Sequence, residues 1–283
     1  MMDNLKPVLI ACAVVCSLWL GSCTSESSYR DLQKSELDTR HFMGFDIPVF
    51  PTARDQLNYA RSGFPDPKEK RAALNFLFKA FPQSRAECGS AALGLAYINL
   101  EPDYRFALGL DHRKAVKEFK AVIKEFKNLP RVQVKAHWYI GWIYCDLLKE
   151  IETGLPYYRF VVEAYPDLEM GISPPVPWVS LVYSPAGNEN RMTKSKEREH
   201  WASLSLLEII RHTADAQEAL DAFDTLWDRY RYSAATGLAI KLMLENRAYR
   251  DKALLHTEPY LALNVANPYL SGEIEERAKE RLP

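Results

Sequence analysis

Hydrophobic side chains recur at helical spacing along most of this chain. One such stretch runs from Ala115 to Phe126, where the apolar residues are separated by steps of four or three and lysines take the opposite face. No segment shows a sustained alternation of apolar and polar residues, which is the pattern of a half-buried strand. The chain is therefore predicted to be all-α from about Thr52 onward.

Short polar motifs mark where two of these helices begin. Asp66 is followed by a proline and, three positions after the aspartate, by Glu69, which together give an N-cap, a first-turn proline and a capping-box glutamate. Asp215 is followed by Glu218 at the same spacing. The segment 167–192 differs, because it is rich in proline and has no helical stripe, and we expect a long loop or an insertion there.

The helical region also contains recurring motifs, which indicate internal repetition. Phe81-Pro82 and Tyr165-Pro166 each end a helical run, and a large apolar residue lies eight positions before each proline. A Leu/Ile-Gly-x-x-Tyr motif is centred on Gly94 and again on Gly141. The predicted helical hairpins lie near 52–81, 84–128, 131–165, 194–231 and 233–263, and a terminal helix lies near 271–282.

These motifs resemble the tetratricopeptide (TPR) repeat. The resemblance implies an α-solenoid of about five hairpins with a terminal capping helix. In such a fold a glycine lies where paired helices cross closely, an aromatic residue fills the wedge between them, and a proline stops the second helix. The chain departs from the pattern around 101–110, where the second hairpin is longer, and at 167–192. The alternative is a set of unrelated packed helices.

The N-terminal residues have the features of a targeting signal. The stretch 7–20 has 14 residues without a charge, which suits a signal-peptide core and is shorter than the about 20 residues of a membrane-spanning helix. It leads into Leu20-Gly21-Ser22-Cys23, which resembles the bacterial lipobox. The resemblance implies cleavage before Cys23 and acylation of that cysteine. An ordinary secretory signal and a short buried helix are the alternatives.

This predicted targeting signal determines the expected domain organisation. Residues 1–22 are the signal peptide, 23–50 the lipidated cysteine with a polar tether, and 51–283 the helical-repeat domain. No aspartate follows Cys23. By resemblance to enterobacterial sorting, we expect lipid anchoring at the periplasmic face of the outer membrane.

The charge balance and the cysteine content limit the possible partners and disulfides. Lys+Arg is 36 and Asp+Glu is 37, giving a net charge of −1, which argues against nucleic acid as a partner. Two of the five cysteines leave with the signal peptide. If Gly94 and Gly141 are equivalent, Cys88 and Cys145 lie too far apart along their helices to pair. We therefore expect two buried free thiols.

No motif of enzymatic chemistry is present in the sequence. It contains no G-x-S-x-G, H-E-x-x-H, P-loop or G-x-G-x-x-G pattern. We therefore expect no enzyme activity, no cofactor and no metal. Glu208 and His212 lie one helical turn apart and have the spacing of two metal ligands, but an exposed helix face with a charge pair is the favoured interpretation.

The TPR resemblance also suggests a binding surface, because the first helix of each hairpin lines the concave face in that family. Two interpretations of helix 136–148 stay open, since it is apolar nearly all round and is suited equally to a groove wall and to a buried position. The segment 174–178 is either a polyproline arm or a loop that packs its own tryptophan. The groove candidates carried over from the family are Lys135, Trp138, Trp142, Asp146, Glu208, Arg211 and His212.

Lipobox, tether and repeats together resemble the BamD-like outer-membrane lipoproteins. The resemblance implies a scaffold that binds a protein or peptide partner in a cell-envelope assembly or secretion machine. The alternative is an all-α protein that binds or hydrolyses cell-wall glycan. A hydrolase predicts a deep pocket with two facing carboxylates about 5–9.5 Å apart, and a scaffold predicts an open groove.

Overall fold

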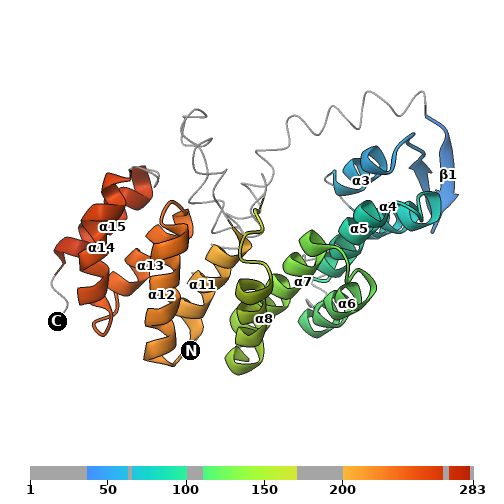
Figure 1. Ribbon diagram of the computed structural model, residues 1–283. Helices are drawn as coiled ribbons and strands as arrows, with labels where there is room; N and C mark the ends of the chain where they lie inside the picture. The colour runs from blue at the N-terminus through green and yellow to red at the C-terminus, as the bar shows by residue number, and fades with distance from the viewer. Residues whose placement is uncertain (1–36, 63–65, 101–110, 171–199, 264–267, 281–283) are drawn as a thin grey trace, which may run out of the picture. The chain divides into compact units, whose positions relative to one another are not determined.

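A computed structural model of the chain describes residues 37–62, 66–100, 111–170, 200–263 and 268–280 (Figure 1). The described residues contain eleven α-helices, one π-helical turn and one two-stranded β-hairpin. The predicted all-α class is therefore confirmed. The chain divides into two compact units, 1–133 and 134–283.

The first unit consists of the β-hairpin and four helices that follow one another in space as in sequence. Strand β2 packs on α4, α3 packs on α4, α4 on α5, and α5 on α6. The elements are β1 (Thr39–Phe42), β2 (Phe45–Pro48), α3 (Ala53–Arg61), α4 (Pro67–Ala80), α5 (Arg85–Ile98) and α6 (His112–Glu125).

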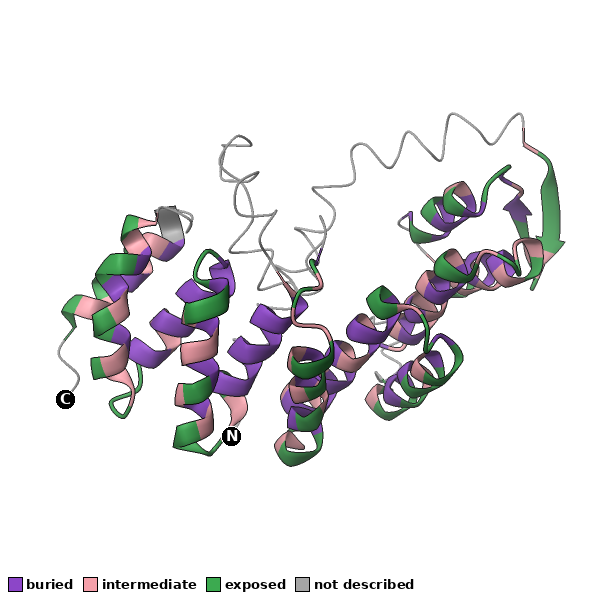
Figure 2. Cartoon of the chain, viewed as in Figure 1, coloured by how far each residue is buried: buried purple, intermediate pink, exposed green. Residues whose placement is uncertain are grey.

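The second unit contains most of α7 and all later helices. Helix α11 is the most enclosed element, since every residue from Trp201 to Ile210 is buried (Figure 2). It packs on α8, α12 and α13, and α15 closes on α13 and α14. The elements are α7 (Pro130–Trp142), the π-helical turn η1 (Ile143–Leu147), α8 (Ile151–Ala164), α11 (Trp201–His212), α12 (Ala216–Tyr230), α13 (Ala234–Leu244), α14 (Arg250–Ala262) and α15 (Pro268–Lys279).

The helices lie where the repeat motifs predicted them. Each of the five predicted hairpins contains a pair of consecutive helices, and the terminal helix begins at Pro268, slightly earlier than expected. The two predicted N-caps are confirmed. The Asp66 carboxylate accepts a hydrogen bond from the Lys68 amide at 2.8 Å, and the Asp215 carboxylate accepts from the Gln217 amide at 2.9 Å.

The β-hairpin is a correction to the tether predicted over 23–50. Its strands have four residues each and pair in antiparallel register around Met43 and Gly44, whose φ angles of 51° and 85° make the tight turn. Ile47 is fully buried and Phe50 nearly so. Strands this short carry too few residues to produce a visible alternation, so the sequence pattern missed them.

Close helix crossings occur at the predicted glycines. A Cβ placed on Gly141 would lie 2.9 Å from Cε1 of Tyr158, and one placed on Gly94 would lie 3.1 Å from a methyl group of Leu74. The sequence did not single out Gly237, where a Cβ would lie 2.5 Å from the Tyr260 hydroxyl. Helices therefore approach one another where a missing side chain makes room for a large one.

Both remaining thiols are free and buried, as predicted. Burial raises the pKa of Cys88, and it raises the pKa of Cys145 to about 12, so both stay protonated and unreactive at neutral pH. Within the part of the chain that the structure describes, no helix combines the length and apolar character of a membrane span.

The crossing at Gly141 yields a stability prediction. Gly141→Ala should lower the free energy of unfolding by about 1–3 kcal/mol, because the new methyl group overlaps the buried Tyr158 ring. Gly272, in α15, has no atom within 4 Å of its Cβ position, so Gly272→Ala should raise stability by about 0.5–1 kcal/mol through helix propensity. Chemical denaturation of both variants tests this, and equal effects at the two positions would contradict it.

Candidate functional site

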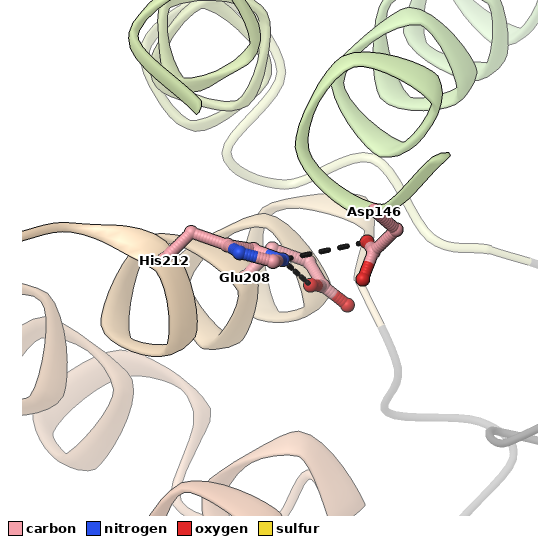
Figure 3. A group of neighbouring side chains, drawn as sticks. All are labelled: Asp146, Glu208 and His212. Carbon is pink, nitrogen blue, oxygen red and sulfur yellow. Dashed lines mark ion pairs between the residues drawn. The ribbon is translucent and has the colours of Figure 1, made fainter. Parts of the chain in front are cut away.

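Four charged side chains meet inside the second unit, and we refer to Asp146, Glu208, Arg211 and His212 as the charged cluster. Three of them lie on α11, at positions 208, 211 and 212, which share one helix face. Asp146 comes from η1, more than sixty positions earlier in the sequence. Figure 3 shows Asp146 facing the pair formed by Glu208 and His212.

The π-helical turn places Asp146 in the cluster. The turn is capped at Leu148, whose amide donates to the Ile143 carbonyl at 2.9 Å, and the next residue, Lys149, has a φ of 59°. A π turn inserts one residue into the helical ladder and so redirects the side chains that follow. Helix α8 approaches this turn closely, because a Cβ on Gly154 would lie only 2.4 Å from Sγ of Cys145.

His212 lies between the two carboxylates. Its Nε2 atom is 3.4 Å from Oδ2 of Asp146 and 3.4 Å from Oε2 of Glu208. Arg211 closes the outer side, since its Nη1 atom is 3.2 Å from Oε2 of Glu208 and its Nη2 atom donates to Oδ1 of Asp146. Each carboxylate therefore contacts both cationic side chains.

The cluster is largely removed from water. The Glu208 side chain is 0% exposed, His212 10%, Asp146 12% and Arg211 35%. Two adjacent carboxylates in such a place need neutralising charge, because unpaired buried charges are costly. Burial lowers the pKa of His212, but its contacts with Asp146 and Glu208 outweigh that effect and the pKa lies above its usual value. Arg211, together with His212 in its protonated form, would balance the two carboxylates.

Several buried polar atoms at the cluster lack hydrogen bonds. In the described residues, the unpaired atoms include Oδ2 of Asp146, Oε2 of Glu208 and Nε2 of His212, together with the Tyr158 hydroxyl and Nε1 of Trp138. Burial raises the pKa of Tyr158 well above its usual value, and the negative charge of Glu208 adds to the effect. Buried polar atoms are normally paired, so a concentration of unpaired ones marks an unusual place in the core.

The structure brings together four of the seven predicted groove residues, which are the members of the charged cluster. The two tryptophans instead pack against the hydrophobic core. Trp138 is fully buried, with its ring packed edge-on against Tyr158 and Trp201, so its assignment to a groove wall is wrong and the buried interpretation of this part of the helix is correct. Trp142 is half-buried against the core and Tyr139. Lys135 is half-buried, with Nζ 6.0 Å from the centre of the Trp201 ring.

The expectation that Glu208 and His212 share an exposed helix face is also wrong. The helix pattern alone gave no sign that η1 would cover this face of α11, because Asp146 reaches it from a distant part of the sequence. The sequence grouped Asp146 with these residues only through the family's groove frame. Their burial is a tertiary effect.

A group of aromatic side chains on α7, on α8 and at the C-cap of α8, of which Phe160 is exposed and the others are half-buried, was missed by the sequence prediction. Phe160 is 39% exposed and its ring stacks on His137 with 4.2 Å between centroids, while the Tyr165 ring lies edge-on to it at 5.9 Å. Tyr157 lies 6.0 Å from the same His137 ring. The available signal was that Phe160 lies outside the buried stripe of α8, which includes Leu155 and Tyr158. We call His137, Tyr157, Phe160 and Tyr165 the aromatic patch.

Three predicted features lie outside the described residues. They are the lipidation site at Cys23, the longer connection at 101–110 and the proline-rich segment 174–178. Most of the predicted insertion 167–192 also lies outside the described residues, but Glu169 near its start pairs with His200, beyond its predicted end, in an isolated antiparallel bridge.

No protein-family model, curated protein or solved structure matches the chain. The charged cluster and the aromatic patch are therefore interpreted from their own geometry and chemistry.

Proposed function

We propose that this protein is a lipid-anchored helical-repeat scaffold at the periplasmic face of a bacterial outer membrane. It binds a protein or peptide partner in an envelope assembly or secretion machine. The observation that carries the proposal is the succession of five helix pairs at the positions given by the TPR-like motifs, with a small residue facing a large one at Gly94 and Gly141. Repeated helix pairs are a common platform for binding extended protein segments.

The anchoring part of the proposal rests on the sequence around Cys23. The uncharged stretch and the Leu-Gly-Ser-Cys motif resemble a lipoprotein signal. More than one acyl chain on the N-terminal cysteine gives stable membrane attachment, which a single chain does not. The BamD-like lipoproteins combine the same elements, and the resemblance supports a scaffold role.

The partner contact in this proposal is the aromatic patch rather than the buried Trp138. Aromatic side chains are enriched at the centres of protein interfaces because they bury a large area at low entropic cost. Phe160 is among the few large apolar side chains that the described residues expose. Since the His137 ring stacks on Phe160 and the Tyr165 ring packs edge-on against it, the patch is organised before a partner arrives.

The glycan-hydrolase alternative has less support. Asp146 and Glu208 are neighbouring carboxylates, but Glu208 is completely buried and both are held by Arg211. A surface depression of about 300 Å³ lies on α11 and α12, and its lining residues, among them Asp215 and Asp221, include no member of the charged cluster. The charged cluster and the depression are therefore separate features. Two of the carboxylates that line the depression have other partners, because Asp215 caps α12 and Glu218 is paired with Arg159.

Lipidation gives the first test of this proposal. In a Gram-negative host fed an alkyne analogue of palmitate, the wild-type protein should incorporate the label and Cys23→Ser should lose it completely. Cys16→Ser is the matched control, because Cys16 lies within the proposed leader and its replacement should leave labelling unchanged. An unlabelled wild-type protein, or a labelled Cys23→Ser variant, would show that the chain is not anchored in this way.

Partner binding gives the second test. A photo-crosslinking phenylalanine analogue at position 160 should yield discrete higher-mass adducts in living cells. The same analogue at position 255 is the control, because Leu255 is a 73% exposed apolar residue on α14, away from the aromatic patch. Adducts at 160 but not at 255 are expected. Absence of adducts at 160, or equal yields at both positions, argues against the patch as the contact surface.

A further inference from the structure

The charged cluster has a property that the scaffold role does not use. Three different residues present one ligand atom each toward a common point: a carboxylate oxygen of Asp146, a carboxylate oxygen of Glu208 and Nε2 of His212. These atoms all lie within 4.8 Å of one another. Figure 3 shows the three side chains converging from η1 and α11.

The distances between these atoms suit a small tetrahedral ion. Zinc binds histidine nitrogen and carboxylate oxygen at about 2.0–2.2 Å, which places neighbouring ligand atoms of a tetrahedral site about 3.3 Å apart. Nε2 of His212 lies 3.4 Å from Oδ2 of Asp146 and 3.4 Å from Oε2 of Glu208. Two edges of the coordination polyhedron are therefore already formed.

A separate observation also points to a ligand. The same three atoms are buried and lack hydrogen-bond partners, and the Glu208 side chain that carries one of them is completely buried. Their contacts are ion pairs of 3.2–3.4 Å with one another and with Arg211, and one bound cation would give all three atoms a direct ligand bond. We propose that Asp146, Glu208 and His212 form a binding site for one zinc ion.

Arg211 is compatible with this site as a supporting residue. Its Nη2 atom donates to Oδ1 of Asp146, which leaves Oδ2 for the ion, and its Nη1 atom lies 3.5 Å from Oε1 of Glu208. Hydrogen bonds to the outer oxygens of metal-bound carboxylates orient the ligands. The Nη1 atom also approaches Oε2 at 3.2 Å, so ion binding shifts this guanidinium toward Oε1.

The donor set favours zinc over the common hard cations. Calcium and magnesium are bound in proteins almost entirely by oxygen atoms, whereas the imidazole of His212 is a typical zinc ligand. Three protein donors leave one tetrahedral position for water, as in sites that exchange their fourth ligand. The proposal concerns binding at this site and is independent of the scaffold role.

Metal content of the full chain tests the proposal. The detergent-solubilised protein is stripped with a chelator, equilibrated with zinc in the presence of excess magnesium, desalted and analysed by elemental mass spectrometry. The wild-type chain should retain one zinc ion per molecule and unfold at a higher temperature than the stripped protein. Asp146→Asn and His212→Gln should each reduce zinc affinity at least about 100-fold.

His256→Gln is the matched control. His256 lies in the same unit and packs against Trp227, away from the three ligands, so its replacement should leave zinc content unchanged. Circular dichroism verifies that the variants are folded. A wild-type chain without zinc, or a folded His212→Gln variant that binds zinc as tightly as the wild type, would overturn the proposal and leave the cluster as an ion-pair network only.

Cobalt substitution supplies a readout that needs no variant. Loaded with one equivalent of Co²⁺ in place of zinc, the wild-type protein should show the intense visible absorption of a four-coordinate ion with nitrogen and oxygen ligands. The weak spectrum of a six-coordinate, water-bound ion would overturn the proposal even if the ligand variants did not fold.

Discussion

Two carboxylates on different elements, Asp146 and Glu208, are buried beside each other in the second unit, and the protein has to neutralise them there. Arg211 and His212 do so from the same face of α11. Since breaking one buried partner leaves an uncompensated charge, this interaction fixes the position of η1 against α11. It also explains why α11 accepts polar residues although it is the most buried helix of the unit.

The packing around the cluster follows from this constraint. Asp146 reaches α11 because η1 widens the helix by one residue, and α8 fits against that turn because Gly154 and Gly141 leave room for Cys145 and Tyr158. Helix α8 thus has two roles. Its buried Tyr158 hydroxyl feels the charges of Glu208 and Asp146, and its exposed Phe160 ring stacks on His137.

Local sequence signals predicted the helices well, because their causes are local. Spacing of apolar residues, the caps at Asp66 and Asp215, and the glycine motifs at Gly94 and Gly141 located every helix pair. The β-hairpin was missed because four-residue strands carry too little pattern. The candidate site was only partly predictable.

The candidate site could be predicted only in part, because burial of a given helix face depends on which distant element covers it. Glu208 and His212 form a recognisable pair on one helix, but nothing in their neighbourhood shows that Asp146 will cover them. Trp138 was equally ambiguous, because a helix that is apolar all round has no pattern that identifies its outer face. Phe160 was detectable in principle, as an aromatic residue outside the buried stripe of α8.

A double-mutant cycle between Asp146 and Arg211 tests most directly whether this buried charge pairing holds the unit together. Free energies of unfolding are measured in chelator for the wild type, Asp146→Asn, Arg211→Gln and the double variant. The pairing predicts a coupling energy of about 1–3 kcal/mol, since each single change leaves a charged partner uncompensated. Additive effects, within about 0.5 kcal/mol, would contradict the central role of the cluster.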